Sequence, residues 1–228
     1  MARLEDDAAR EFHYLRHDAD WVNADITVTT DEGQIPIAPG YEVSSQTENG
    51  RVTARFRTDA PIMHFFSIQS ADYEVARDRH NNIELAVYYD RRHPFNVERM
   101  MRAMKVSFEV FEREFSPFQF RQMRILEFPA YAQFAQSFAN TVPYSESIGF
   151  IARYDDATAE RETERVDYVT YVTAHEVAHQ WWAHQIIGAD MQGSTMLSET
   201  FASYSSAAGD GRNPRPRPGA PFPPPGAR

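Results

Sequence analysis

Alternation of apolar and polar residues dominates the chain between residues 21 and 90. The alternating segments are 24–29, 51–57, 62–68 and 83–89. Turn sequences, DEG at 31–33 and ENG at 48–50, lie between neighbouring segments. A period of two with such turns is typical of antiparallel strands that have one buried face. We therefore expect residues 21–90 to be mostly β-structure.

The period changes after Pro94. Residues 95–115 place apolar side chains at helical spacing, which predicts a helix with one buried stripe. The stripe consists of Val97, Met100, Met101, Met104, Phe108, Phe111 and Phe115. A stripe of this kind is more often core than a binding surface, and we interpret it as core.

Two further strands are expected, at 118–128 and at 144–151, with an aromatic loop between them. The second of these strands carries Glu146 among small polar residues. Together with the helices on either side, this order of elements describes an α+β domain.

Residues 170–187 contain no proline or glycine, which predicts a helix that ends at Gly188. His175 and His179 are four residues apart and therefore project from one face of that helix, a single turn apart. Two imidazoles so placed can bind one metal ion. Glu176 follows the first histidine directly and can reach a water molecule near the ion, which is the position that a general base needs.

A catalytic zinc ion takes three protein ligands and leaves a position for water. Glu199, twenty residues beyond His179, is the best third ligand, because a helix that begins near Thr195 would return alongside the first. The HExxH pattern also occurs in helices whose histidines are only solvated. The glutamate at this distance favours a metal site over that interpretation. His184 would lie on the opposite side of the helix, and we exclude it as a ligand.

Composition narrows the functional classes. The 228 residues carry a formal net charge of −10 and a pI near 5.3, which argues against a nucleic-acid partner because phosphate binding needs a basic face. Cysteine is absent, so histidines and carboxylates remain as metal ligands. We find no apolar run long enough to span a membrane and no signal peptide in residues 1–20. The cellular location stays open.

Three stretches of the sequence resemble the aminopeptidase N family of zinc metallopeptidases, which are gluzincins. HEVAHQWW at 175–182 is similar to the family's HELAHQWF, and SETFASY at 198–204 is similar to NEGFASY. SESIGFI at 145–151 resembles the GAMEN-WGLI stretch, with Glu146 in the place of that motif's glutamate. The family uses that edge strand to pair with peptide backbone and that glutamate to hold the substrate's free α-amine.

The resemblance implies a site and a reaction. One Zn²⁺ per chain would be bound by His175, His179 and Glu199, with Glu176 as the general base. The substrate would be a peptide from which N-terminal residues are released, and Glu146 would bind its ammonium group.

A closer resemblance, over residues from about 10 to about 205, is to bacterial proteins in which such a peptidase portion follows an ABC-2-type membrane permease. It implies that 1–90 are the end of an N-terminal antiparallel β domain and that 91–206 are the first half of a thermolysin-like catalytic domain. Residues 207–228 are rich in proline, glycine and arginine, and we expect a disordered tail. We interpret the chain as a truncated fragment.

Three departures from the family leave alternatives open. SESIGFI keeps only the glutamate and the glycine of the GAMEN-WGLI stretch. The spacing between His179 and Glu199 is one residue longer than usual, and no residue matches the family's oxyanion-binding tyrosine, since Tyr204 follows Glu199 too closely. The chain could therefore be an impaired fragment that binds zinc or peptide without hydrolysis. It could also be an endopeptidase in which Glu146 is only a polar strand residue, or the histidines could be purely structural.

Overall fold

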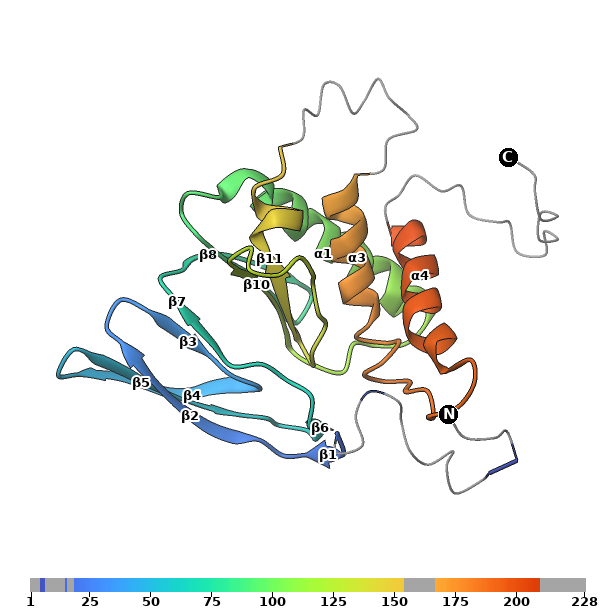
Figure 1. The fold of residues 1–228 in the computed structure, drawn as a ribbon, viewed down its shortest axis with the longest axis horizontal. Coiled ribbons are helices and arrows are strands. Elements are labelled where there is room, and N and C mark those ends of the chain that lie inside the picture. The colour runs from blue at the N-terminus through green and yellow to red at the C-terminus, as the bar shows by residue number, and fades with distance from the viewer. Residues whose placement is uncertain (1–4, 7–14, 16–18, 154–166, 210–228) are drawn as a thin grey trace.

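The structure is a computed structural model that describes residues 5, 6, 15, 19–153 and 167–209 (Figure 1). Its N-terminal part is built from short strands. They are β1 (Trp21–Val22), β2 (Asp25–Asp31), β3 (Ile35–Ile37), β4 (Tyr41–Glu48), β5 (Arg51–Arg57), β6 (Ile62–Met63) and β7 (Gln69–Ala71). Strands β2, β5 and β4 form an antiparallel sheet, while β1 pairs with β6 and β3 with β7. The expected β-structure is thus present, although the strand expected at 62–68 is only two residues long.

The hairpin between β4 and β5 follows the sequence directly. Asn49 and Gly50 both have positive φ, as a two-residue type I′ turn requires. Alternating positions of β5 then point inward, where Ala54 and Phe56 are almost completely buried.

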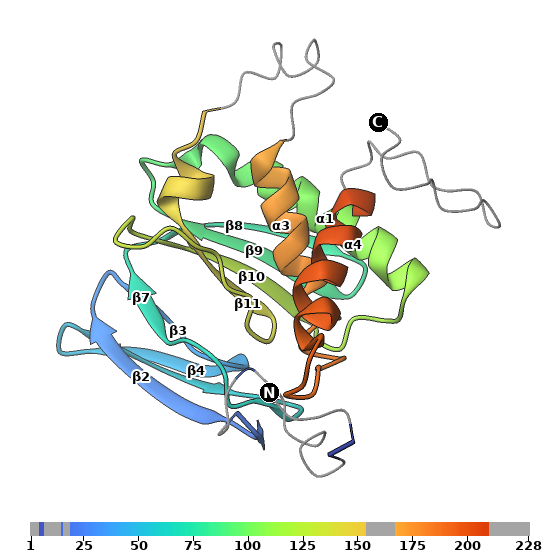
Figure 2. The same cartoon turned by 45° about the vertical axis from the view of Figure 1, so that its right-hand side comes forward.

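The central layer is a four-stranded sheet with the order β11-β10-β9-β8. Its strands are β8 (Glu74–His80), β9 (Ile83–Tyr89), β10 (Gln122–Phe128) and β11 (Thr141–Ser145). Only β8 and β9 are antiparallel; β9, β10 and β11 run parallel. β10 is buried over nearly its whole length, as strands covered on both faces are. Figure 2 shows the helices on one side of this sheet and β2 and β4 on the other.

Strands β8 and β9 lie before residue 90 but pair into a sheet with strands that come after it. The division of the chain into domains at residue 90 stays a prediction. At the other end, α4 continues through Gly209, beyond residue 207, where the tail was expected to begin. Residues 210–228 lie outside the described part of the chain.

Helix α1 (Val97–Glu114) confirms the predicted apolar stripe except at Phe115, which follows the helix and is 42% exposed. Met100, Met104, Phe108 and Phe111 are fully buried and pack in one core cluster with residues of the central sheet. Helix α3 (Tyr168–Ala178) packs on α1. Asp167 is the N-cap residue of α3, and its carboxylate accepts the Thr170 N–H at 3.1 Å. The same carboxylate forms an ion pair with Arg99 of α1.

Two expectations about local structure are wrong. The first is the strand at 144–151: β11 ends at Ser145, and Glu146–Phe150 form one wide helical turn, η3, closed by the Ile151 N–H on the Glu146 carbonyl. The buried Asn96 side chain holds this turn by donating to the carbonyls of Gly149 and Ala152 at 2.6 and 2.5 Å. This contact comes from a distant segment, which alternation cannot reveal.

The second is the helix expected to reach Ile187, since α3 ends at Ala178. Beyond it, Trp181 packs beneath α1 against Phe108 and Phe111, whereas Trp182 packs on Phe115. Tertiary contacts of these adjacent indoles override the helical propensity of the segment. Among the described residues, none of the helices is long and apolar enough to cross a membrane.

Candidate metal centre

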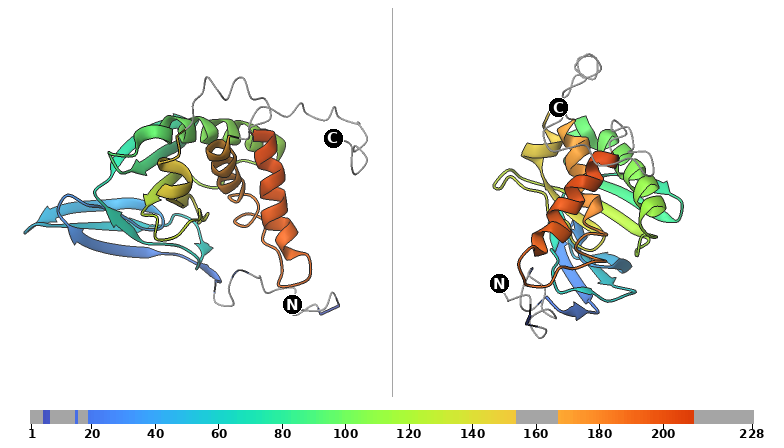
Figure 3. Two further views of the ribbon diagram at one scale, coloured as in Figure 1. Left: turned by 45° about the horizontal axis from the view of Figure 1, so that its top comes forward. Right: turned by 90° about the vertical axis from the view of Figure 1, so that its right-hand side faces the viewer.

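Three side chains from two neighbouring elements converge beside the end of α3. His175 lies in the last turn of α3 and His179 directly follows the helix as its C-cap residue; their Nε2 atoms lie 3.0 Å apart. Glu199 comes from η4 (Met196–Thr200), the wide turn that leads into α4 (Phe201–Gly209). Its Oε2 lies 3.3 Å from His175 Nε2 and 3.6 Å from His179 Nε2. The expected return of the second helix is visible in Figure 3, where α4 lies next to α3.

These distances can be compared with those around a tetrahedral zinc ion. Bonds of about 2.0–2.2 Å at tetrahedral angles separate two ligand atoms by about 3.3–3.6 Å. The three separations between the candidate donors are 3.0, 3.3 and 3.6 Å. The two imidazoles and the carboxylate therefore fit one small divalent cation.

The other nitrogen of each imidazole has an oxygen partner that fixes the ring. His179 Nδ1 lies 3.0 Å from the Trp182 carbonyl oxygen, which can only accept a hydrogen bond. In the neutral ring the hydrogen is therefore on Nδ1 and the lone pair of Nε2 faces the centre, where it can bind a metal ion; when the ring is protonated, Nε2–H instead faces Glu199. His175 Nδ1 lies 3.4 Å from the Ser203 hydroxyl of α4. Sequence spacing did not reveal these partners, because one is a backbone atom and the other belongs to the returning helix.

The carboxylates of the centre differ in environment. Hydrogen bonds from His175 and His179 hold the pKa of Glu199 well below its usual range. Burial raises the pKa of Glu176, although both imidazoles oppose that shift. Glu176 Oε2 is buried and has no hydrogen-bond partner among the described residues. A buried carboxylate oxygen without a partner is unusual and is available to bind a proton or a water molecule.

Gln180 fastens the end of α3 to the loop that leads into β11. Its amide group donates to the Ser137 hydroxyl at 2.7 Å and to the Phe138 carbonyl at 2.9 Å, and it accepts the Asn140 N–H at 2.8 Å. The Ser137 hydroxyl in turn donates to the Glu176 carbonyl at 2.9 Å. The sequence analysis did not predict this network. The only feature of the sequence that could have indicated it is Gln180, directly after the second histidine.

The outer edge of β11 is already occupied. The Gln136 N–H donates to the Pro143 carbonyl and the Ser145 N–H donates to the Phe134 carbonyl, both at 3.0 Å. The resemblance implies that the stretch at 145–151 pairs with a peptide. At Ser145 the chain itself fills that position, and Glu146–Phe150 form the turn η3.

Glu146 lies outside the convergent group, in a second cluster with His93 and Glu127. Its Oε1 accepts the Ala130 N–H at 3.0 Å, and its Oε2 lies 3.6 Å from His93 Nδ1. His93 Nδ1 is only 2.5 Å from Glu127 Oε1, which is a hydrogen-bond distance and too short for two ligands of one ion. Burial raises the pKa of Glu127, and the hydrogen bond from His93 opposes it. Sequence analysis missed His93 and Glu127.

His184 lies outside the centre, as expected. It is buried, its Nε2 lies 3.2 Å from the Ser137 carbonyl, and burial lowers its pKa to about 4. Trp181 and Trp182 pack against other aromatic rings and donate through Nε1 to Ser116 and Ser205.

Comparisons with known proteins bear on this arrangement. No family model matches the chain. Over 186 residues, 79% of the chain, it is 25% identical to a leucyl aminopeptidase of Saccharolobus solfataricus. Its structure is similar to that of a variant of the M1 zinc metallopeptidase of Deinococcus radiodurans, with a TM-score of 0.63, 18% sequence identity and 86% of the chain covered. The chain has part of the M1 metallopeptidase fold.

The similarity extends over only part of each relative. The chain spans 22% of the leucyl aminopeptidase and 43% of the Deinococcus chain. The α+β fold expected from the sequence is confirmed. What these relatives bind and hydrolyse is carried to this chain only by the proposal that follows.

Proposed function

We propose that this chain is a zinc-dependent metallopeptidase domain of the aminopeptidase type, with one Zn²⁺ held by His175, His179 and Glu199. The observation that carries the proposal is the convergence of three donor atoms: Glu199 Oε2 lies 3.3 and 3.6 Å from the two Nε2 atoms, as around one tetrahedral ion, and the two Nε2 atoms, 3.0 Å apart, are slightly closer than that geometry gives. The names of both relatives, a leucyl aminopeptidase and a zinc metallopeptidase, support the same reaction class.

In the proposed reaction, the zinc ion and Glu176 have different roles. When bound, zinc would lower the pKa of a water molecule to about 7 and polarise the scissile carbonyl. Glu176 accepts a proton from the attacking water and passes it to the leaving amine. Its burial, its raised pKa and its oxygen without a partner suit a group that takes up a proton during the reaction and releases it again.

Glu146 binds the free ammonium group of the peptide substrate in this proposal. Its carboxylate is partly exposed, and the neighbouring Glu127 adds negative charge. His93 lies within hydrogen-bond distance of Glu127 and orients that carboxylate. An N-acetylated peptide lacks the charge that this cluster attracts, so it would be a poor substrate. Equal hydrolysis of free and acetylated peptides would instead indicate an endopeptidase.

A second candidate function is zinc or peptide binding without efficient hydrolysis. The observation that favours it concerns Tyr204, which lies five residues beyond Glu199 and is 58% exposed on α4. Within the described residues no hydrogen bond joins Tyr204 to the centre, so this tyrosine is not placed to stabilise an oxyanion there. Loss of one such donor typically lowers the rate by about 10²–10³.

The test combines metal analysis with hydrolysis of an aminoacyl anilide by the full chain. We expect one zinc per chain in the wild type, unchanged zinc but abolished turnover in Glu176→Gln, and loss of zinc in Glu199→Ala. Glu109→Gln, on the exposed face of α1, is the matched control and should change neither quantity. Wild-type protein without zinc would refute the proposal. Stoichiometric zinc without turnover would select the second candidate.

A further inference from the structure

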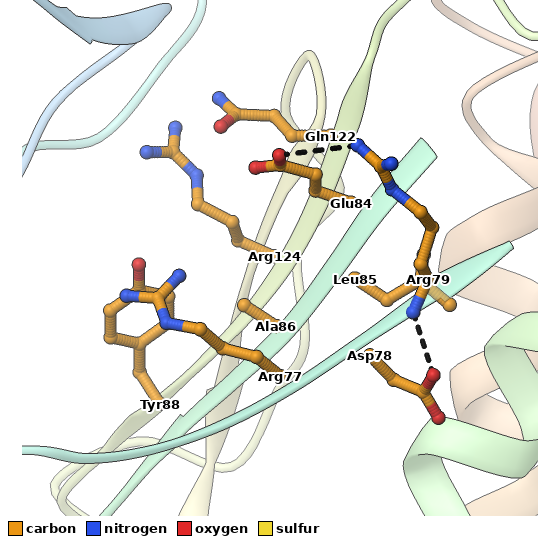
Figure 4. Close-up of a pocket in the computed structure, with 9 residues that line it drawn as sticks. All are labelled: Arg77, Asp78, Arg79, Glu84, Leu85, Ala86, Tyr88, Gln122 and Arg124. Carbon is orange, nitrogen blue, oxygen red and sulfur yellow. Dashed lines mark hydrogen bonds and ion pairs between the residues drawn. The ribbon is translucent and has the colours of Figure 1, made fainter. Parts of the chain in front are cut away.

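A cavity of about 350 Å³ lies on the central sheet. It is formed by alternate residues of β8, β9 and β10 on the face that looks away from the helices, and Figure 4 shows the side chains around it. The lining residues are Arg77, Arg79, Glu84, Ala86, Tyr88, Gln122 and Arg124, together with Asp78 and Leu85 of the same strands. None of them belongs to the metal centre, which lies at the end of α3 on the helical side of the sheet.

The strand register explains why the sheet is hollow here. Ala86 of the middle strand pairs with Arg77 of β8 on one side and with Arg124 of β10 on the other. Strands lie about 4.8 Å apart, so the two arginine Cα atoms are separated by about 10 Å across the small alanine. Two long cationic side chains thus stand on either side of a residue that fills little space.

The acidic residues of the cavity already have partners. Glu84 lies 3.5 Å from Arg79, and Asp78 pairs with Lys105 of α1 on the other face of the sheet. Neither carboxylate is left to balance Arg77 or Arg124. The cavity therefore carries excess positive charge, in a chain whose formal net charge is −10.

Arg124 is the buried wall of the cavity, with 5% of its surface exposed. Its Nε and Nη2 donate to uncharged oxygen atoms of Thr141, Asn140 and Ala38, and no carboxylate among the described residues pairs with it. Burial lowers its pKa to about 10, so the guanidinium still carries its charge at neutral pH. A buried charge without a counter-ion is unfavourable, and an anion in the cavity would relieve it.

Arg77 forms the exposed rim. Its guanidinium carbon lies 5.9 Å from the centre of the Tyr88 ring, a weak contact that leaves its donors available. It has no acidic partner among the described residues. Guanidinium groups bind carboxylates and phosphates in a bidentate manner, which makes a pair of them a suitable receptor for a doubly charged oxyanion.

We propose that this cavity binds a small dianion with oxygen acceptors, either a phosphate monoester or a dicarboxylate, between Arg77 and Arg124 and above Ala86. Its less polar part would lie against Tyr88. The site is independent of the metal centre and of the peptidase reaction. The competing explanation is that Arg124 only ties the sheet to the segment at Ala38, and it predicts no response to anions.

The test is isothermal titration calorimetry of the full chain with inorganic phosphate and, separately, with succinate, at an ionic strength fixed with sodium chloride. We expect saturable binding of at least one anion. If phosphate alone binds, the ligand is a phosphate compound; if succinate alone binds, it is a dicarboxylate. Binding of neither anion would overturn the proposal.

Two variants locate the site. Arg77→Gln should weaken binding about tenfold, as expected for loss of a charged hydrogen-bond donor. Ala86→Leu fills the hollow without changing the charge and should abolish binding. Arg102→Gln, an exposed arginine of α1, is the matched control and should bind as the wild type does. If Ala86→Leu does not fold, Arg77→Gln decides alone, and unchanged affinity in that variant would overturn the proposal.

Discussion

Replacement of Asn96 by alanine tests whether the turn that carries Glu146 is held by a single side chain. Asn96 is 2% exposed, and its amide donates to two backbone carbonyls, those of Gly149 and Ala152. Alanine leaves both carbonyls without this donor. Because an unsatisfied buried polar group costs about 1–3 kcal/mol, we expect a loss of about 2–4 kcal/mol of unfolding free energy.

Urea denaturation measures this loss as a shift of the midpoint at constant slope. A differential scan should show Tm lower by roughly 5–15 °C, since 1 kcal/mol corresponds to about 2–4 °C for a chain of this size. The exposed Asn23→Ala is the matched control and should stay near the wild-type value.

The same variant has a functional readout that a merely destabilised protein would not give. If η3 positions Glu146 for the substrate ammonium, Asn96→Ala should raise KM for an aminoacyl anilide and leave the zinc content unchanged. A stability loss below about 0.5 kcal/mol would refute the assignment of the two hydrogen bonds. A stability loss with an unchanged KM would refute the role of the turn in substrate binding.

Three further predictions concern packing, pH and metal. Gly149→Ala should destabilise the chain by about 1–3 kcal/mol in urea denaturation, because a Cβ there would clash with the Tyr144 ring and the end of the Met100 side chain; a wild-type midpoint would contradict this. Burial lowers the pKa of His184 to about 4, so its neutral ring contributes stability that is fully present above pH 6.5 and is lost as the pH falls towards 4, by about 3 kcal/mol in total. His184→Gln should flatten that part of the stability profile measured by denaturation at a series of pH values. A chelator should lower Tm of the wild type, whereas Glu199→Ala should not respond, and an equal response in both would argue against this metal centre.

Sequence patterns predicted the elements whose burial is regular. Helix α1 and strand β5 have one continuous buried face, so their period alone reveals them, whereas β9 is buried on both faces from Leu85 to Tyr88. Strand β4 escaped prediction because nearly all of its residues are exposed, which leaves no alternation to detect. The turn η3 escaped because a side chain 53 residues away holds it.

In the candidate site, too, the sequence predicted the contacts that local geometry determines and missed those between distant segments. Spacing alone indicates that His175 and His179 share a helical face, because helix geometry is local. The approach of Glu199 depends on how α4 returns, and its Oε2 lies 3.3 Å from His175 Nε2; its role as a metal ligand stays a prediction. His93 and Glu127 could not be joined to Glu146 from the sequence, since three separate segments bring them together.

Gln180 directly follows His179, and its side-chain amide hydrogen-bonds to three polar groups of the segment at 137–140. The loop in front of β11 and the imidazole face of α3 are consequently mechanically coupled. The segment at 137–140 can therefore move away from α3 only if all three hydrogen bonds to Gln180 break. If they stay intact, the end of α3 that carries His175 must move with the segment.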